Sequence, residues 1–476
     1  MRYKNLPFFI LIFPLLLSWK PALAQTLSKE SYTAAQQQLQ EIENTKDLSI
    51  TEKASPGHNF FQFSYGEWLN TSYTDTQDIY HQVIKDPASS ILTDDLRLWG
   101  NLTFGQHNEI YIRLKDDYSY MRTSSDYAGP GGAGGNNSGP HLDMGYLLLG
   151  SRNVQLQIGR QYLSVGSGIA YSDVNDGIKL KEEINNAWIL KEFVGQSQPH
   201  EYSLDYSMPG WDKYADKRYF FGAEAGYVQI QHLIPYVYYL AQKDHSSPNP
   251  SDPAQNFRYN SQYWGAGLTG KYQNLSYWME IIEETGHDFT DTSNGTLPLE
   301  KTPVNAQDVN TGVRYNFQTI FNPTSELGFS YGSGDKNRPS PTNTVGGNTN
   351  NTDTNFLYFG NYYGGYALAP RLSNLFIYKI DQSFQPLNNF KIFKNFDIGA
   401  KYLIYVKNKS TAGISDVEAD LPRSFVGTET DFYIHWIITK HVSLSLRYGD
   451  FFPGRAFDPG RRSDSKYYYA SLNFAF

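Results

Sequence analysis

The sequence contains no cysteine among its 476 residues. Disulfide bonds, thiol nucleophiles and thiolate metal sites are therefore excluded. Beyond the first 24 residues there is also no apolar run of about 18 residues, so we expect no transmembrane helix. Charged residues make up only 18% of the chain. Stability without disulfides must therefore come from the pairing of secondary structure and from side-chain packing.

Motifs of enzymes and of metal or nucleotide binding are absent as well. The chain has no GxSxG, no HExxH and no Walker loop, and its 10 histidines are scattered. His435 lies near Glu429 and Asp431, but a structural or pore-lining histidine explains this better than a catalytic one. A net charge of -8 disfavours nucleic-acid binding. We expect no cofactor, no metal and no catalytic residue; an enzyme would need a nucleophile and base together at one rim.

The N-terminus predicts export from the cytoplasm. Arg2 and Lys4 precede an apolar run, Leu6–Trp19, and Ala22-Leu23-Ala24 offers a cleavage site. This pattern predicts a signal peptide over residues 1–24, with an uncleaved anchor helix as the alternative. Residues 25–58, rich in Ala, Gln and Glu, predict a short helix or flexible periplasmic leader.

What the chain has in abundance is aromatic residues, 16% of the total, together with 40 glycines and a period-two pattern. In "DDLRLWGNLTF", the leucines alternate with Asp95, Arg97 and Asn101. The final stretch, "KYYYASLNFAF", alternates in the same way and ends on Phe476. Period two predicts β-strands whose two faces meet different environments.

These strands predict one domain, residues 59–476, that is an all-β transmembrane antiparallel barrel. We count about 18 segments of roughly ten residues, and bacterial barrels have even strand numbers. A closed barrel in lipid pairs every backbone N–H and carbonyl group and leaves no unpaired strand edge. The terminal Phe also occupies the position where outer-membrane assembly signals usually lie. The alternative, a soluble β-sandwich, has to bury too many apolar faces in one core. We therefore predict an outer-membrane location, with membrane lipid around the barrel.

Long polar segments between the strands predict exposed loops on one side of the membrane. They cover residues 128–140, 245–256, 290–302 and 332–355. The last of these is long enough to act as a plug or as an external lid.

Alternation places many charged residues on the inner face. An isolated buried ion costs several kcal/mol, so such residues line water or pair with one another. They form either a selectivity surface or salt-bridge ladders that brace the wall. The basic members are Arg97, Arg113, Lys115, Lys179, Lys181, Arg314, Lys379, Lys401 and Arg447, and the acidic ones include Asp117, Glu224, Glu280, Glu284, Glu429 and Asp431.

Arg160 breaks the alternation, because Val154, Leu156 and Ile158 before it face lipid. An arginine in the middle of a bilayer costs about 2–4 kcal/mol. We predict a β-bulge at Gly159 that turns Arg160 toward the lumen. The alternative is an arginine that reaches the membrane interface.

Two stretches resemble the alginate export family. "IGRQYLSVGSGIAYSDVNDGIKL" (Ile158–Leu180) is similar to its GRQ strand and the following loop. "VGTETDFYIHWIITKHVSLSLRYGDFFPGRAF" (Val426–Phe457) is similar to its near-terminal hairpin. The resemblance implies an 18-stranded outer-membrane barrel that passes an anionic exopolysaccharide outward through an arginine-rich lumen. By motif, it implies lumen roles for Arg160, Glu429, Asp431 and Arg447.

The expected function is therefore a channel for an alginate-like polyuronate. The polysaccharide and a periplasmic export machinery are the expected partners. The alternative is a general or substrate-specific uptake porin for small solutes. A porin of that kind has a loop folded inward to form a narrow eyelet, whereas an exporter has a groove along its full height and a movable plug.

Overall fold

The structure is a computed structural model. It describes residues 61–78, 81, 88–123, 133–197, 218–245, 258–290, 300–338, 341, 344, 347–348 and 352–476. The predicted signal peptide and leader lie outside these residues and remain predictions. No helix within the described ranges is long and apolar enough to cross a membrane.

Within the described residues the chain forms 19 strands and a short 3₁₀ turn at Lys391–Phe393. The strands are β1 (Phe61–Gln77), β2 (Ala88–Phe104), β3 (Asn108–Thr123), β4 (Ala133–Asn137), β5 (His141–Gly150), β6 (Val154–Val165), β7 (Tyr171–Ile184), β8 (Trp188–Gln196), β9 (Arg218–Tyr227), β10 (Leu233–Asp244), β11 (Tyr259–Tyr272), β12 (Leu275–Thr290), β13 (Glu300–Asn316), β14 (Thr324–Gly332), β15 (Leu375–Phe384), β16 (Phe396–Lys407), β17 (Phe425–Thr439), β18 (Val442–Pro453) and β19 (Ser465–Ala475).

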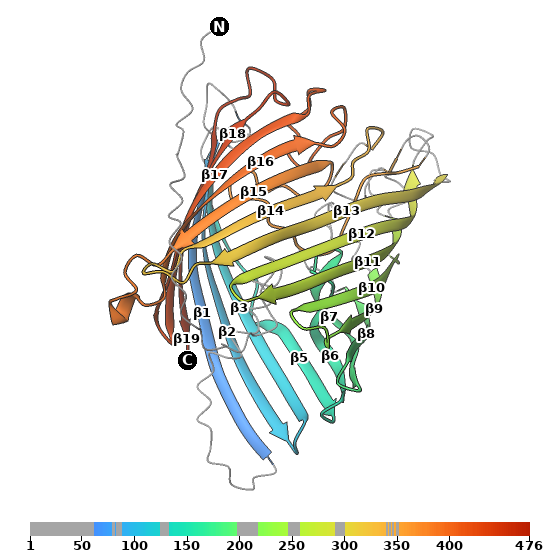
Figure 1. Ribbon diagram of the computed structural model, residues 1–476, viewed down its shortest axis with the longest axis vertical. Coiled ribbons are helices and arrows are strands. Elements are labelled where there is room, and N and C mark those ends of the chain that lie inside the picture. The colour runs from blue at the N-terminus through green and yellow to red at the C-terminus, as the bar shows by residue number, and fades with distance from the viewer. Residues whose placement is uncertain are drawn as a thin grey trace.

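The sheet closes into a barrel. Successive strands pair antiparallel, and β19 pairs back onto β1, so the first and last strands lie side by side (Figure 1). Phe476 completes this closure: its N–H donates to the Glu67 carbonyl at 2.9 Å, and its carbonyl accepts the Glu67 N–H at 2.8 Å. The predicted role of the C-terminal strand in closing the ring is confirmed.

The wall has 18 strands, as predicted, because β4 and β5 together make one of them. Both pair with β3, β4 at Tyr118–Arg122 and β5 at Glu109–Lys115. The break between them contains Pro140, which has no N–H to give to the ladder.

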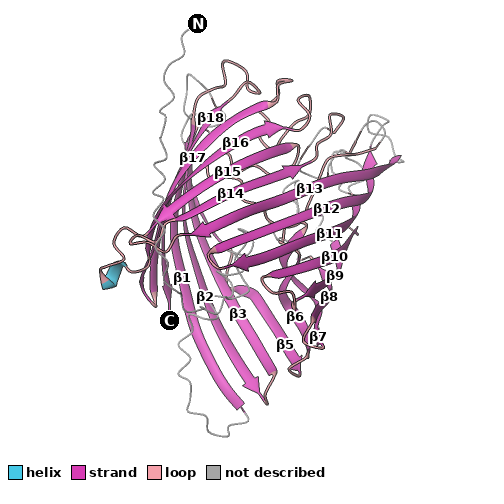
Figure 2. Cartoon of the chain, viewed as in Figure 1, coloured by secondary structure: helices cyan, strands magenta, loops and turns pink. Residues whose placement is uncertain are grey.

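The two ends of the barrel differ in their connections (Figure 2). At one end short links join the strands, such as Gln273–Asn274 between β11 and β12, and the C-terminus lies there too. We call this the turn end. The opposite loop end carries the longer connections, of which residues 333–374 between β14 and β15 are an example.

Alternation separates an apolar outer face from the lumen along the strands. On β3, the side chain of Ile112 is 50% exposed, whereas its neighbours Tyr111 and Arg113 are 3% and 1% exposed. An apolar outer face on a closed barrel is what a lipid environment requires. The barrel wall runs from β1 to β19.

Candidate functional site

Two connections at the loop end fold back into the lumen. One is the tip of the β6–β7 hairpin, residues 166–170, and the other is the β14–β15 segment, by which we mean the described residues among 333–374. They bond to each other, because the Phe359 N–H donates to the Ala170 carbonyl at 3.0 Å and the Asn361 N–H donates to the Gly168 carbonyl at 3.1 Å. Any Cβ at Gly360 would overlap the Gly168 carbonyl oxygen. The two inserted segments thus form one unit. These contacts involve residues beyond Asn355, so the choice between a plug and an external lid for residues 332–355 remains a prediction.

Wall carboxylates hold the hairpin tip through its backbone. Glu280 lies between Met279 and Ile281, which are exposed on the outer face, so its own side chain faces the lumen. It accepts the Ser167 N–H at 2.7 Å and the Ser167 hydroxyl at 2.6 Å. Glu224 accepts the N–H of Gly166 at 2.9 Å. These predicted lumen acids therefore bind backbone N–H groups.

A third carboxylate, Glu284, holds the β14–β15 segment. It accepts the Leu357 N–H at 2.9 Å and the hydroxyls of Tyr259 and Tyr263 at 2.6 and 3.0 Å. The Tyr263 hydroxyl is also 2.8 Å from the Leu357 carbonyl, and its single proton bonds either to that carbonyl or to Glu284. Leu357 is thus held at its N–H, with a hydroxyl beside its carbonyl.

Around these bonds the segment packs into an apolar group that we call the packed cluster. Phe356, Leu357 and Phe359 are at most 4% exposed. The Phe359 ring lies 5.6 Å from that of Phe220 on β9, and the Phe356 ring 6.4 Å from that of Tyr263 on β11. The cluster also includes Leu163, Val165, Tyr171, Leu240, Ile282, Ile377, Leu403 and Tyr405 from the wall and the hairpin.

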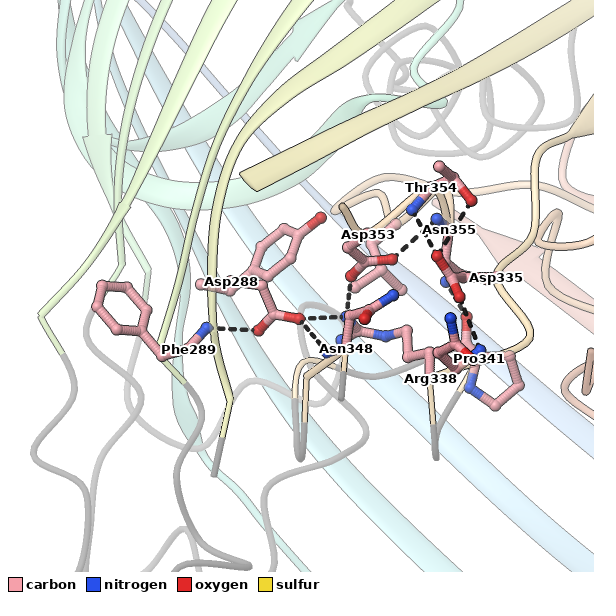
Figure 3. A network of polar contacts seen from close by, with 12 residues as sticks. Asp288, Phe289, Asp335, Arg338, Pro341, Asn348, Asp353, Thr354 and Asn355 are labelled. Carbon is pink, nitrogen blue, oxygen red and sulfur yellow. Dashed lines mark hydrogen bonds and ion pairs between the residues drawn. The ribbon is translucent and has the colours of Figure 1, made fainter. Parts of the chain in front are cut away.

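The first part of the segment is anchored at the loop end by a buried polar network (Figure 3). The Arg338 guanidinium binds two carboxylates, that of Asp288 at 2.7 Å and that of Asp353. Asp288 also accepts the Asn348 N–H at 2.9 Å. Burial raises the pKa of Asp353 to about 6, and the neighbouring Asp288 carboxylate adds to the rise while Arg338 opposes it. Two acids thus share one buried guanidinium.

The predicted basic residues of the lumen form a second group, the charged band. It consists of Arg97, Arg113, Lys115, Arg314, Lys379, Lys401 and Arg447. Unlike the packed cluster, it contains Arg and Lys side chains that keep part of their surface exposed, such as Arg97 at 17% and Lys115 at 23%.

On β2, β3 and β5 the bases of the charged band lie among carboxylates. Arg97 binds Asp95 at 2.7 Å, and Lys115 lies 3.6 Å from the same carboxylate. Lys115 also pairs with Asp117 at 2.9 Å. Arg113 is 2.5 Å from Asp143. These side chains form a salt-bridge ladder along the wall, in which Arg97 and Lys115 stay partly exposed and Arg113 is buried.

A similar group lies on β13, β14 and β15. One carboxylate oxygen of Glu326 lies 2.5 Å from the Arg314 guanidinium, and the other lies 2.6 Å from Lys379 Nζ. Arg314 and Lys379 remain 32% and 30% exposed, whereas Glu326 is 5% exposed. Two cations therefore share the Glu326 carboxylate, and Asp381 on β15 interacts electrostatically with both of them.

Lys401 and Arg447 flank an aromatic side chain from the β14–β15 segment. Lys401 Nζ donates to the Tyr366 hydroxyl at 2.9 Å and lies 4.3 Å from the ring centroid. The Arg447 guanidinium lies 5.7 Å from the Tyr366 ring and 5.0 Å from that of Tyr469. The segment thus reaches from the packed cluster to the charged band.

The two predicted acids of β17 are both fully buried. Glu429 accepts the backbone N–H of Tyr366, at 2.5 Å, and the Tyr405 hydroxyl, at 2.8 Å. Asp431 lies beside Glu429 and interacts electrostatically with Lys401. These acids therefore position the β14–β15 segment and a base of the band.

Three predicted lumen bases lie outside the charged band. Lys181 lies 3.7 Å from Glu183. Lys179 donates to the Tyr162 carbonyl at 3.1 Å. The bulge predicted at Gly159 is wrong: β6 pairs with β7 without a register shift from Val154 to Val165, so Arg160 stays on the same face as Ile158.

Arg160 is tolerated on that face because a neighbouring carboxylate and a backbone carbonyl bind its guanidinium. The guanidinium lies 3.0 Å from Asp176, directly opposite on β7, and donates to the Leu142 carbonyl at 2.6 Å. Pairing of β5 with β6 ends at Gly145 and Arg160. Arg160 thus contacts the edge of β5 where the β6–β7 hairpin turns inward, instead of joining the charged band.

Sequence reasoning missed the residues of the inserted segments. The run "NFLYFGNYYGGY", residues 355–366, was a usable signal, since it is strongly aromatic yet follows the predicted loop and lacks period two. The carboxylate contacts had no such signal. Their partners are backbone N–H groups, which any residue except proline provides.

Comparison with known proteins identifies the family. The Alginate export family model matches residues 67–471, most of the chain. The chain belongs to the alginate export family. This member has the barrel of an outer-membrane channel protein and is located in the outer membrane.

Solved structures share its fold at low identity. OccK7 of Pseudomonas aeruginosa is 11% identical, with 87% of this chain and 99% of that chain covered and a TM-score of 0.52. OccK5 of the same organism is 8% identical, with coverages of 87% and 98% and a TM-score of 0.52. OccAB3 of Acinetobacter baumannii is 12% identical, with coverages of 87% and 99% and a TM-score of 0.51. No curated protein matches the chain.

Proposed function

We propose that this channel passes an anionic polysaccharide, an alginate-like polyuronate, outward along the charged band. The observation that carries the proposal is that Lys401 and Arg447 both lie close to the Tyr366 ring, with the Tyr469 ring also beside Arg447. Cations suit the carboxylate of a uronate, and aromatic faces suit the apolar face of a sugar ring. Membership of the alginate export family supports the same substrate class.

Weak, repeated contacts suit a polymer that has to slide. Most bases of the band have an acid close by, such as Glu326 for Arg314 and Lys379, which fixes the cation in position. A partly neutralised cation holds a passing carboxylate less firmly than a free one, so no single site traps the chain. Short turns of such barrels face the periplasm and long loops face outward. Polymer would therefore enter at the turn end, driven by an export machinery on the periplasmic side.

A second candidate is an uptake porin for small solutes. The inserted β14–β15 segment favours it, because an inward-folded segment narrows the lumen at one level as an eyelet does. A small anion would then use the same bases one at a time.

Planar bilayer recordings test the proposal. Under a salt gradient, we expect a reversal potential that indicates anion preference, and polyuronate added on the turn-end side should block the current. Arg447→Ala and Lys401→Ala should each weaken the block several-fold. Arg160→Gln is the matched control, because Arg160 pairs with Asp176 away from the band, so the block should be unchanged. Cation preference together with indifference to polyuronate would reject the exporter and favour the porin.

A further inference from the structure

Three consecutive backbone N–H groups of the β14–β15 segment converge on one carboxylate. Those of Tyr366, Ala367 and Leu368 donate to Glu429 at 2.5, 2.7 and 3.1 Å. We call these three N–H groups the amide nest. Such a concavity of backbone N–H groups binds anions in general, since it supplies partial positive charge without a specific side chain.

Glycines fix the shape of the amide nest. Gly365 has φ +131°, which other residues rarely adopt, and a Cβ there would lie 2.7 Å from a Glu429 oxygen. On β18, a Cβ at Gly449 would lie 2.9 Å from the Ala367 nitrogen. The sequence thus permits both the backbone turn and its close approach to the wall.

A second acid lies beside the occupant of the nest. Asp431 is in contact with Glu429 and with the Tyr366 N–H, so two carboxyl groups compete for that donor. Lys401 and Arg447, in contrast, contact the ring of Tyr366, whose N–H belongs to the nest. A carboxylate arriving from the charged band therefore reaches the nest past two cations.

We propose that the amide nest is a binding site for a uronate carboxylate, which enters it by replacing that of Glu429. This inference rests on the proposed function. The exchange swaps one carboxylate for another, so the three N–H bonds are conserved. Release of Glu429 then frees the Tyr366–Leu368 stretch from β17, and the substrate itself loosens the segment that crosses its path.

Labelling of a single cysteine tests this, because the native chain has none to interfere. In the full barrel carrying Ala367→Cys, the rate of reaction with a water-soluble maleimide is measured in sodium glucuronate and in sodium chloride of equal ionic strength. We expect glucuronate to raise the rate at least threefold, because Ala367 leaves the wall with its neighbours. Tyr363→Cys is the matched control: Tyr363 is 47% exposed, so its rate should be the same in both salts.

Removing the resident carboxylate should reverse the effect. In Ala367→Cys with Glu429→Ala, the rate should be high in chloride, and glucuronate should lower it by occupying the empty nest. Equal rates in glucuronate and chloride in both backgrounds would overturn the inference, even if polyuronate still blocks the current. Glucuronate-dependent labelling without any polyuronate block would instead reject the export function and keep the carboxylate site.

Discussion

The packed cluster and the charged band are built from inward positions of the same kind of strand, yet the charged side chains of the two regions differ in burial and in number of partners. Beside the packed cluster, Arg338 and Glu284 are completely buried and bind several groups each. In the band, Arg314 and Lys379 remain about a third exposed and share one carboxylate.

The two regions differ in what covers the inner face of the barrel wall. Where an inserted segment covers the wall, N–H and hydroxyl groups donate hydrogen bonds to a wall carboxylate in place of water. Where no segment covers it, water and ions complete the solvation. Buried charges such as Glu284 and Arg338 therefore hold the inserted segment, and part-exposed charges such as Arg314 and Lys379 remain available to a solute.

Phe359→Ala should give the largest effect. The Phe359 ring is 3% exposed and packs against Phe220 and the Arg218 guanidinium. Removing a buried Phe side chain costs about 3–5 kcal/mol, which we expect to undock the β14–β15 segment while the barrel stays folded. Single-channel conductance and the rate of proteolysis within the segment should both rise.

Tyr363→Ala is the control for that substitution, since it truncates an exposed ring of the same segment. It should leave both measurements near those of the unchanged protein. If Phe359→Ala also left them unchanged, the packed cluster would not be what holds the segment.

Arg338→Ala should have the next largest effect. It leaves the carboxylates of Asp288 and Asp353 buried together without their cation. Breaking a buried ion pair by removing one partner costs about 3 kcal/mol or more. Proteolysis of the segment should accelerate, and adding Asp353→Asn should recover part of the loss. Without any recovery in the double variant, repulsion between the two acids would not be the cause.

Protonation of Asp353 gives a smaller, reversible effect. Its pKa is raised to about 6 in the docked segment, whereas an undocked Asp353 would return to the ordinary value of 3.8. The docked form therefore binds more protons between these values, so docking is favoured as pH falls and weakens as pH rises through 6. Between pH 7 and pH 5 the docking equilibrium should shift by about tenfold, or 1.4 kcal/mol.

Proteolysis of the segment as a function of pH measures that shift. Asp353→Asn should reduce the pH dependence between pH 7 and pH 5, because Asp353 faces Arg338, Asp288, Tyr259 and Glu284, and Glu284 holds the same segment. A dependence of unchanged size in this variant would assign the titration to a group other than Asp353.

The alternation of residues was enough to predict the barrel, its 18 wall strands and the inward direction of most charges. Period two fixes the face of each side chain whatever the tertiary partners are, so Arg97, Glu280 and Glu429 were placed correctly. Period two does not predict which group of another segment an inward side chain contacts. Ser167 and Glu280 are 113 residues apart, and a backbone N–H leaves no mark in the sequence. Arg160 was misplaced because the ion pair with Asp176 removes the need for a bulge.

Arg314→Gln should have the smallest effect on stability and still change selectivity. Glu326 keeps Lys379 at 2.6 Å when Arg314 loses its charge, and the Arg314 side chain is 32% exposed. Solvent-screened pairs of this kind contribute about 1 kcal/mol or less, so unfolding in urea should barely shift. The reversal potential under a salt gradient should nevertheless move toward cations, because one positive charge of the band is gone. A loss of stability as large as that of Arg338→Ala would mean that Arg314 braces the wall as a buried charge does. The division of the lumen into holding and conducting charges would then fail at this residue.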